Sequence, residues 1–168
     1  MEEFKQLYHL HKNLVYNLAL QYTNNIQDAE EILQDVFMKV HENIHNFRNE
    51  VEIKTWIYRI TINQSLDFIK AQQRKKRSIF KNILGLNTIG ETLLISDFNH
   101  IGIDLENKEA LEHLMRKVYR LPENQKTVII LLKIEELSQK EVAEIMQLTE
   151  GAVESLLQRA KSNLKKML

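Results

Sequence analysis

LSQKEVAEIMQLTEGAVESLLQRAKSNLKKML, residues 137–168, decides the fold, because its pattern indicates two helices joined by a tight turn. Ser138 and Glu141 have the spacing of a capping box at the start of the first helix. Gln147-Leu148 interrupts the pattern, and Thr149 is a typical N-cap for the second helix. That helix carries an inward apolar stripe: Val153, Leu156, Leu157, Ala160 and Leu164. With its basic C-terminal end, this outline is typical of a DNA-binding helix-turn-helix; an ordinary helical hairpin with solvated charges is the alternative.

The composition favours an all-α protein without cysteine chemistry. The 168 residues include one Pro and four Gly, and β-branched residues recur at spacings of three and four. The absence of Cys excludes disulfides, Cys-ligated zinc and thiol catalysis, and suits a reducing cytoplasm. No apolar run approaches the ~20 residues of a membrane span, and the acidic, amphipathic N-terminus is unlike a signal peptide. We therefore expect a cytoplasmic, all-α protein.

Charge is balanced overall but distributed unevenly along the chain. Lys and Arg number 23, as do Asp and Glu. Residues 70–81 carry only basic charges, whereas residues 26–45 carry acidic side chains against Lys39 alone. Separate patches of this kind can bind a polyanion with one and a polar or basic protein surface with the other. Two solvated helix faces are the alternative, but the density of the basic run favours a phosphate contact.

Three amphipathic patterns, at 3–22, 26–45 and 53–77, predict a helical N-terminal domain over residues 1–77. On the outward face of the second helix, Met38 stands among polar and acidic residues. An exposed apolar side chain in such surroundings suits a partner surface.

Residues 78–106 form a linker, and a second helical domain follows at 107–168. The linker holds three of the four glycines but is rich in apolar residues, so we expect it to pack against a domain or a partner. In the second domain, Pro122 is expected at the first position of a helix. The predicted architecture is two small helical domains joined by a linker, the C-terminal one containing the helix-turn-helix.

His41-Glu42-Asn43-Ile44-His45 matches the H-E-x-x-H pattern of zinc proteases. Two histidines four residues apart on a helix can bind one zinc ion, with the Glu as base. The pattern lies at the end of its predicted helix, and no third ligand follows at the extended spacing. A chance match in a structural helix is the favoured interpretation, and we expect no metal and no catalytic residue.

Taken in order, these segments resemble bacterial RNA polymerase sigma factors of the extracytoplasmic-function (ECF) group. DAEEILQDVFMKV (28–40) resembles the helix that binds the clamp of the largest polymerase subunit. FRNEVEIKTWIYRITINQSLDFIK (47–70) resembles the region that melts promoters and recognises the minus-ten element. Residues 121–166 resemble the domain that recognises the minus-thirty-five element. The resemblance covers residues 1–77, as sigma region 2, and 107–168, as sigma region 4.

The resemblance implies roles for residues of the first domain. The face that binds polymerase would comprise Glu31, Gln34, Asp35 and Met38. The loop Phe47, Arg48 and Asn49 would hold a flipped base, which requires a pocket that hydrogen-bonds one base edge. Minus-ten contacts would further comprise Asn63 and Asp67, and, to phosphates, Lys70, Arg74, Lys75, Lys76 and Arg77. A purely structural polar role for Asn63 is the alternative.

In the second domain, the resemblance implies that the recognition helix enters the major groove. Its contacts with the minus-thirty-five element would comprise Thr149, Glu150, Gly151, Ala152, Ser155, Gln158, Arg159 and Lys161. Three positions depart from the family's usual basic residues: Ile62, Glu154 and Leu156. Each departure removes a phosphate attraction, so we expect weak DNA affinity for the free protein and dependence on polymerase.

The implied function is that of a dissociable, non-enzymatic subunit for transcription initiation. Its partners would be promoter DNA and core RNA polymerase, through the clamp of the largest subunit and the flap of the second-largest. No cofactor or small-molecule substrate is implied. The family also implies control by an anti-sigma protein, often membrane-anchored, with the apolar linker involved in masking. A helix-turn-helix regulator that binds duplex DNA without polymerase is the alternative, although it would leave the acidic helix without a role.

Overall fold

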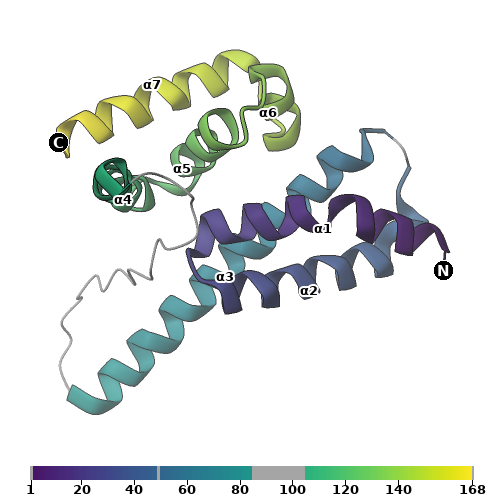
Figure 1. Cartoon of the computed structure of the whole chain (residues 1–168), viewed down its shortest axis with the longest axis horizontal. Coiled ribbons are helices and arrows are strands. Elements are labelled where there is room, and N and C mark those ends of the chain that lie inside the picture. The colour runs from purple at the N-terminus through teal and green to yellow at the C-terminus, as the bar shows by residue number, and fades with distance from the viewer. Residues whose placement is uncertain (1, 49, 85–104, 168) are drawn as a thin grey trace. The chain divides into compact units, whose positions relative to one another are not determined.

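The computed structural model describes residues 2–48, 50–84 and 105–167, and over these ranges the chain is helical, without a strand (Figure 1). This confirms the predicted all-α fold. The elements are α1 (Glu2–Thr23), α2 (Ile26–Asn43), the 3-10 helix η1 (Ile44–Asn46), α3 (Ile53–Leu84), α4 (Leu105–Tyr119), α5 (Glu123–Ile129), the π-helix η2 (Ile130–Ile134), α6 (Gln139–Met146) and α7 (Glu150–Lys166). The expected packing of the apolar linker concerns 78–106, most of which lies outside the described residues.

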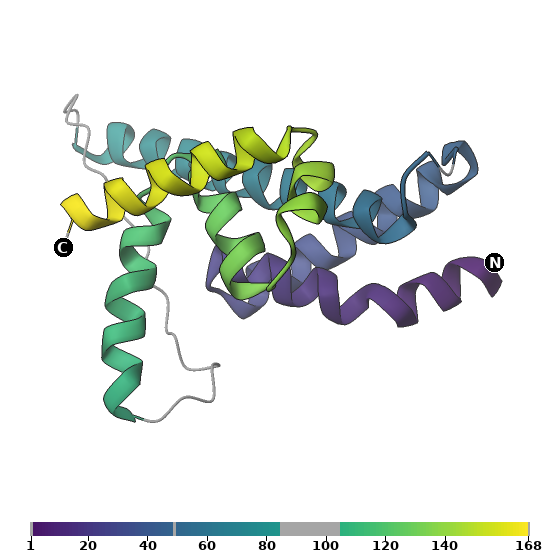
Figure 2. The same ribbon diagram turned by 90° about the horizontal axis from the view of Figure 1, so that it is seen from above.

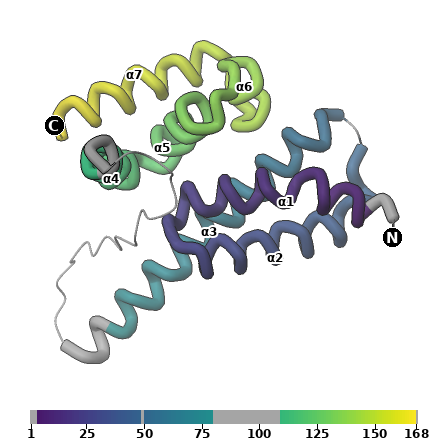
Figure 3. The backbone as a smooth tube through the Cα atoms, viewed as in Figure 1, coloured from purple at the N-terminus to yellow at the C-terminus, as the bar shows by residue number. Residues whose placement is uncertain are grey.

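Contacts divide the chain into two units, residues 1–42 with 60–97 and residues 43–59 with 98–168. The division falls inside α3, which is one continuous helix (Figure 3). The domain limits at 77 and 107 remain a prediction.

In the first unit, α1 and α2 pack side by side as an antiparallel pair (Figure 1). The rings of Tyr8 and Phe37 meet edge to face, with centroids 4.7 Å apart. The fully buried core of the pair comprises Val15, Leu18, Ala19, Ala29, Ile32, Val36 and Val40. α3 is tied to the start of α2 by Gln72, whose Nε2 donates to Asp28 at 3.1 Å. The predicted inward faces therefore form this core.

The turn between α1 and α2 explains where α2 begins. The side-chain oxygen of Asn25 accepts a hydrogen bond from the backbone N–H of Asp28 at 3.0 Å, as an N-cap does. Asn24 adopts a positive φ of 50°, which Asn tolerates better than most residues. Ile26, an apolar residue at the start of α2, is 36% exposed. It is the first residue of α2, and the buried residues of this helix begin only at Ala29.

α3 extends to Leu84, beyond the end predicted at residue 77. No Gly or Pro occurs between Ile53 and Leu84, and the basic run consists mainly of Lys, Arg, Gln and Ala, which favour helices. Gly85 is the first residue of low helix propensity after that run. The helix therefore continues through the change of composition at which the linker was predicted to begin.

In the second unit, α7 packs along α5 and α6 (Figure 2). Asn163 near the end of α7 donates to the side-chain oxygen of Gln125 at 2.9 Å. The core comprises Val128, Ile130, Leu131, Val142, Ile145, Val153, Leu157 and Ala160. Pro122 is the N-cap of α5, with φ −52°, and Glu123 is the first helical residue, so the predicted position of Pro122 is wrong by one residue. Its missing N–H still costs nothing there.

The predicted capping box at the start of α6 is confirmed. The Ser138 hydroxyl accepts from the backbone N–H of Glu141 at 3.2 Å, and the Glu141 carboxylate accepts from the N–H of Ser138 at 2.8 Å. The hydrogen bonds from Ser138 lower the pKa of Glu141. Gln147 ends α6 in the left-handed conformation, with φ 56°. The break between the two helices of the motif is therefore the one that the sequence predicts.

Replacing Ser138 by Ala is expected to destabilise the protein by about 1 kcal/mol, because the first turn of α6 loses its side-chain acceptor. Urea denaturation followed by circular dichroism measures the change. Lys140→Ala, at an exposed neighbouring position, serves as the control and is expected to leave the free energy of unfolding unchanged. Equal stabilities for the two variants would contradict the assignment.

Candidate nucleic-acid and partner interfaces

α7 presents one face to the core and the opposite face to solvent. The Thr149 hydroxyl caps it by accepting from the backbone N–H of Ala152 at 3.2 Å, as predicted. Of the predicted minus-thirty-five residues, Ala152 is half-buried. The exposed ones are Thr149, Glu150, Gly151, Ser155, Gln158, Arg159 and Lys161. The fold thus leaves the amino-terminal turns of α7 accessible.

Several polar groups on α7 are already engaged. The Ser155 hydroxyl donates to the carbonyl of Gly151 at 2.9 Å, and Arg159 Nε donates to the carbonyl of Ser155 at 3.3 Å. The Glu154 carboxylate accepts from Gln158 at 2.7 Å and from Gln139 of α6 at 2.6 Å. The hydrogen bond from Gln158 has the largest effect in lowering the pKa of Glu154, and the bond from Gln139 lowers it further.

Gln139 is absent from the predicted site. The spacing of four between Glu154 and Gln158 is visible in the sequence, but Gln139 lies on a different helix. Its proximity to Glu154 depends on how α6 packs against α7, which no local pattern reveals.

On α2, the four residues predicted to bind polymerase lie opposite the buried stripe. Glu31 and Gln34 are exposed, Asp35 is half-buried, and Met38 is 61% exposed. Ala29, Ile32 and Val36 occupy the buried side. The face thus combines an exposed methionine with carboxylates, and its role as a partner surface remains a prediction.

The H-E-x-x-H pattern does not keep its helical spacing. α2 ends at Asn43, so His41 lies on α2 whereas His45 lies on η1. The His41 ring instead meets the edge of Phe4, with centroids 5.0 Å apart. Within the described ranges, no group of three or more His, Asp or Glu side chains is placed to hold a metal ion. The zinc alternative therefore lacks geometric support.

Two of the three residues in the predicted base-flipping loop are among those that the structure describes. The Phe47 ring lies against Trp56, with centroids 5.0 Å apart and planes tilted by 35°. Arg48 is exposed, and Asn49 lies outside the described residues. Trp56 is half-buried, whereas the neighbouring Ile57 is fully buried.

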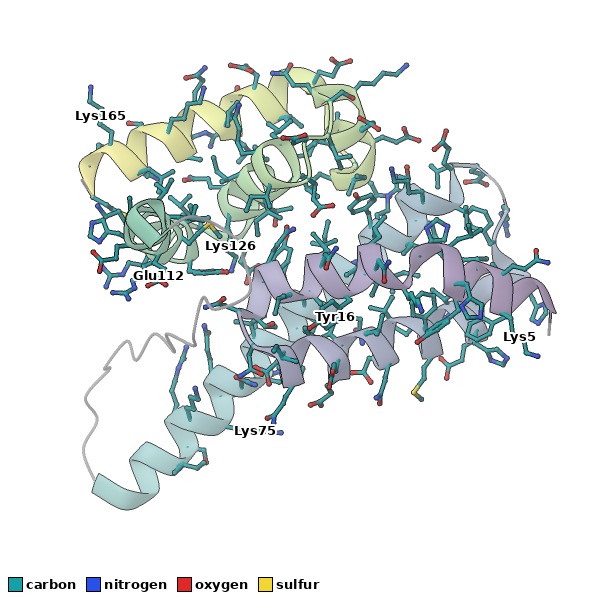
Figure 4. The ribbon with its side chains drawn as sticks, in the orientation of Figure 1. Lys5, Tyr16, Lys75, Glu112, Lys126 and Lys165 are labelled. Atoms are coloured by element: carbon teal, nitrogen blue, oxygen red, sulfur yellow. The ribbon has the colours of Figure 1, made fainter. Side chains whose placement is uncertain are left out.

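Further along α3, Asn63, Asp67, Lys70 and Arg74 are all exposed. Their spacings of four, three and four place them on one face of the helix. Lys75, which points away from α3 in Figure 4, and Arg77 are exposed as well. Lys76 differs, because its ammonium nitrogen is buried and has no hydrogen-bond partner among the described residues. The phosphate role predicted for Lys76 is therefore less well supported than that of its neighbours.

Two of the departures from the family pattern have a structural explanation. Ile62 is only 7% exposed, so it belongs to the core, where an unpaired charge would be costly. Leu156 is half-buried next to the inward stripe of α7. The expectation that Ile62 stands at a phosphate-contacting position is therefore not supported, and Glu154 is the one of the three departures that places a charge on α7.

None of the helices in the described part of the chain has the length and apolar character of a membrane span. The chain combines a capped helix-turn-helix, whose second helix has an exposed face, with a long helix that carries a basic run. These features define a helical DNA-binding protein.

Comparison with known proteins specifies the family. Residues 7–75 match the model of sigma-70 region 2, and residues 111–164 match that of sigma-70 region 4. The chain is 32% identical to RNA polymerase sigma factor SigV of Bacillus subtilis, covering 89% of this chain and 81% of SigV. It is 28% identical to ECF RNA polymerase sigma factor SigW of the same organism, covering 99% and 89%. The chain belongs to the ECF group of RNA polymerase sigma factors.

The fold agrees with this assignment. The sigma factor RpoE of Bartonella quintana, solved in complex with the anti-sigma factor NepR, superposes with a TM-score of 0.67 at 22% identity. The match covers 99% of this chain and 96% of RpoE. This likeness confirms the expected fold, and the family models together with the sequence relatives confirm the predicted resemblance. As a sigma factor, the chain acts in transcription initiation by directing core RNA polymerase to promoters.

Proposed function

We propose that this sigma factor binds core polymerase through one face of α2 and recognises two promoter elements with separate helices. The polymerase-binding face comprises Glu31, Gln34, Asp35 and Met38. α7 recognises the minus-thirty-five element. The loop at Phe47 and Arg48 and the exposed face of α3 recognise and help to open the minus-ten element. The protein acts in the cytoplasm as a non-enzymatic initiation subunit without a cofactor.

The observation that carries this proposal is the exposed face of α7, which lies opposite the core residues Val153, Leu157 and Ala160. A capped helix whose N-terminal turns expose one face can enter the major groove, about 12 Å wide. Gly151 and Ser155 offer little steric bulk, while Gln158 and Arg159 carry groups that hydrogen-bond base edges. The same helix ends in Lys165 and Lys166; Figure 4 shows Lys165 at that end of α7.

The α2 face supports the polymerase contact by its chemistry. Met38 supplies an adaptable apolar contact, and Glu31 and Asp35 supply negative charge on the same face. A partner surface with basic and apolar groups matches this combination. Binding through this face would bury Met38, whose apolar side chain is 61% exposed to water in the free protein.

Two groups of residues support the proposed contact with the minus-ten element. The rings of Phe47 and Trp56, which lie against each other with planes tilted by 35°, offer an aromatic surface on which an unpaired base can pack. On α3, Asn63 and Asp67 can hydrogen-bond base edges, and Lys70 and Arg74, on the same face, can contact phosphates. Base contacts would supply specificity, and phosphate contacts would set the register.

We also propose control by an anti-sigma protein that covers the polymerase-binding face. Two structurally similar sigma factors, RpoE and CnrH, were solved with the anti-sigma factor NepR and with the cytosolic domain of CnrY, respectively. An exposed surface such as that around Met38 can serve only one partner at a time, so an anti-sigma protein that binds it would exclude polymerase.

Transcription in vitro from a library of randomised promoters, with core polymerase alone or with this protein, tests the proposal. We expect initiation at promoters that share two sequence elements only when the protein is present. Initiation without any upstream sequence preference would contradict recognition by α7. Tight binding to the selected promoters without polymerase would contradict the proposed dependence on core enzyme.

The substitution Gly151→Ala distinguishes an effect on DNA binding from an effect on the stability of the fold. A methyl group at this position would meet no protein atom within 4 Å, so the fold is expected to keep or slightly gain stability. If α7 approaches DNA closely here, initiation at promoters with a minus-thirty-five element falls by about tenfold, as overpacking an interface does. Thermal denaturation and promoter titration measure the two effects. Unchanged initiation would show that this part of α7 is not against DNA.

A further inference from the structure

Glu154 occupies an unusual position, because it places a carboxylate on the helix proposed to face a polyanion. It is half-buried and accepts from two amide side chains, one on each helix of the motif. Gln139 Nε2 donates to one carboxylate oxygen at 2.6 Å, and Gln158 Nε2 donates to the other at 2.7 Å. Glu154 thus links the start of α6 to the DNA-facing side of α7.

The chemistry of Glu154 determines which way the Gln158 amide points. An ionised carboxylate only accepts hydrogen bonds, so the amide group turned toward it must be NH₂ and not C=O. One N–H of Gln158 is then used, while its second N–H and its carbonyl oxygen remain available. A donor beside an acceptor is the arrangement with which a glutamine amide binds N7 and N6 of adenine.

We propose that Glu154, held from its other side by Gln139, is a positioning residue that orients the Gln158 amide to recognise an adenine in the minus-thirty-five element. Guanine presents two acceptors, N7 and O6, in the major groove, so one of them would face the amide oxygen. The inference rests on the proposed function of α7 as the minus-thirty-five recognition helix, and it adds the base and the orienting residue.

The discrimination expected from one such contact is about 5- to 150-fold, as for other bidentate pairs. Without Glu154, the amide of Gln158 is free to rotate and to accept or donate in either direction. The preference for adenine should then weaken at that one position, while preferences at other positions persist. A purely structural role for Glu154 would instead lower initiation at all promoters to the same extent.

The test compares base preferences in the promoter library, read as initiation by the full-length variant with core polymerase. Glu154→Ala and Glu154→Met are each expected to reduce a preference for adenine, at the same promoter position that Gln158→Ala affects, to less than about threefold. Glu144→Ala removes an exposed carboxylate of α6 outside this network and is the matched control, with an unchanged base profile. Thermal denaturation establishes that each variant is folded; Glu154→Met keeps the length of the side chain without an oxygen acceptor if Glu154→Ala does not fold.

Three results would overturn the inference. One is an adenine preference that survives both Glu154 variants but is lost in Gln158→Ala, since Gln158 would then need no orienting group. A second is loss of a cytosine preference at a position that Gln158→Ala leaves intact, which would make Glu154 the contacting residue. The third is a uniform fall at all promoters. If instead the wild-type protein shows no upstream preference at all, the proposed function of α7 fails as well.

Discussion

Combining Gln34→Ala with Asp35→Ala is expected to lower the affinity of the sigma factor for core polymerase by about 100-fold, or roughly 2.8 kcal/mol. Gln34 is exposed and Asp35 half-buried, and both lie beside Met38 on the face of α2 opposite the core. Their removal takes hydrogen-bonding groups and a charge from the centre of the proposed interface. Co-purification with core polymerase and titration by fluorescence anisotropy measure the loss.

The fold should survive this double change, because Ala has the highest helix propensity and neither side chain belongs to the fully buried core. Glu30→Ala is the matched control. Glu30 is exposed on the same helix, about 40° from Gln34 and about 140° from Asp35, so its replacement removes an acidic charge from the edge of the face and not from its centre. Normal binding of the double variant, or an equal loss in Glu30→Ala, would refute the assignment of the face.

Replacing Arg74, Lys75 and Arg77 together by Ala is expected to weaken promoter binding by the polymerase holoenzyme about 100-fold at low salt. All three side chains are exposed on the basic part of α3, and fewer counterions are released from DNA when fewer cationic side chains bind its phosphates. The slope of log affinity against log salt should therefore become shallower by about 0.7 to 0.9 for each phosphate that is no longer neutralised. Filter binding over a salt series measures the slope.

The control replaces three lysines outside the basic run, Lys5, Lys12 and Lys133, and so removes the same charge. If proximity to DNA matters rather than net charge, this control keeps the wild-type salt slope. A slope unchanged by the Arg74, Lys75 and Arg77 replacements would place the basic run away from the phosphates. Lys76 is left in place because its ammonium nitrogen is buried, and its replacement would confuse folding with binding.

Local interactions explain why much of this fold can be predicted. The capping box at Ser138 and Glu141 and the cap at Thr149 join groups three residues apart, so their spacing in the sequence is their spacing in space. Apolar residues at spacings of three and four likewise identify the buried sides of α2 and α7. Boundaries without such a signal are less predictable: α3 continues past residue 77 to Leu84, because the composition changes at 77 without a helix-breaking residue.

The sequence by itself determined the all-α fold, the helix-turn-helix with its caps, the face of α2 and the sigma-factor family, because each depends on periodicity or on short motifs. Only the tertiary structure decided that Ile62 is core, that the nitrogen of Lys76 is buried, and that Gln139 meets Glu154 across two helices. These outcomes depend on the angle and distance at which helices pack, which are set by many side chains at once. The positioning role proposed for Glu154 therefore depends in part on its contact with Gln139, which no local pattern predicts.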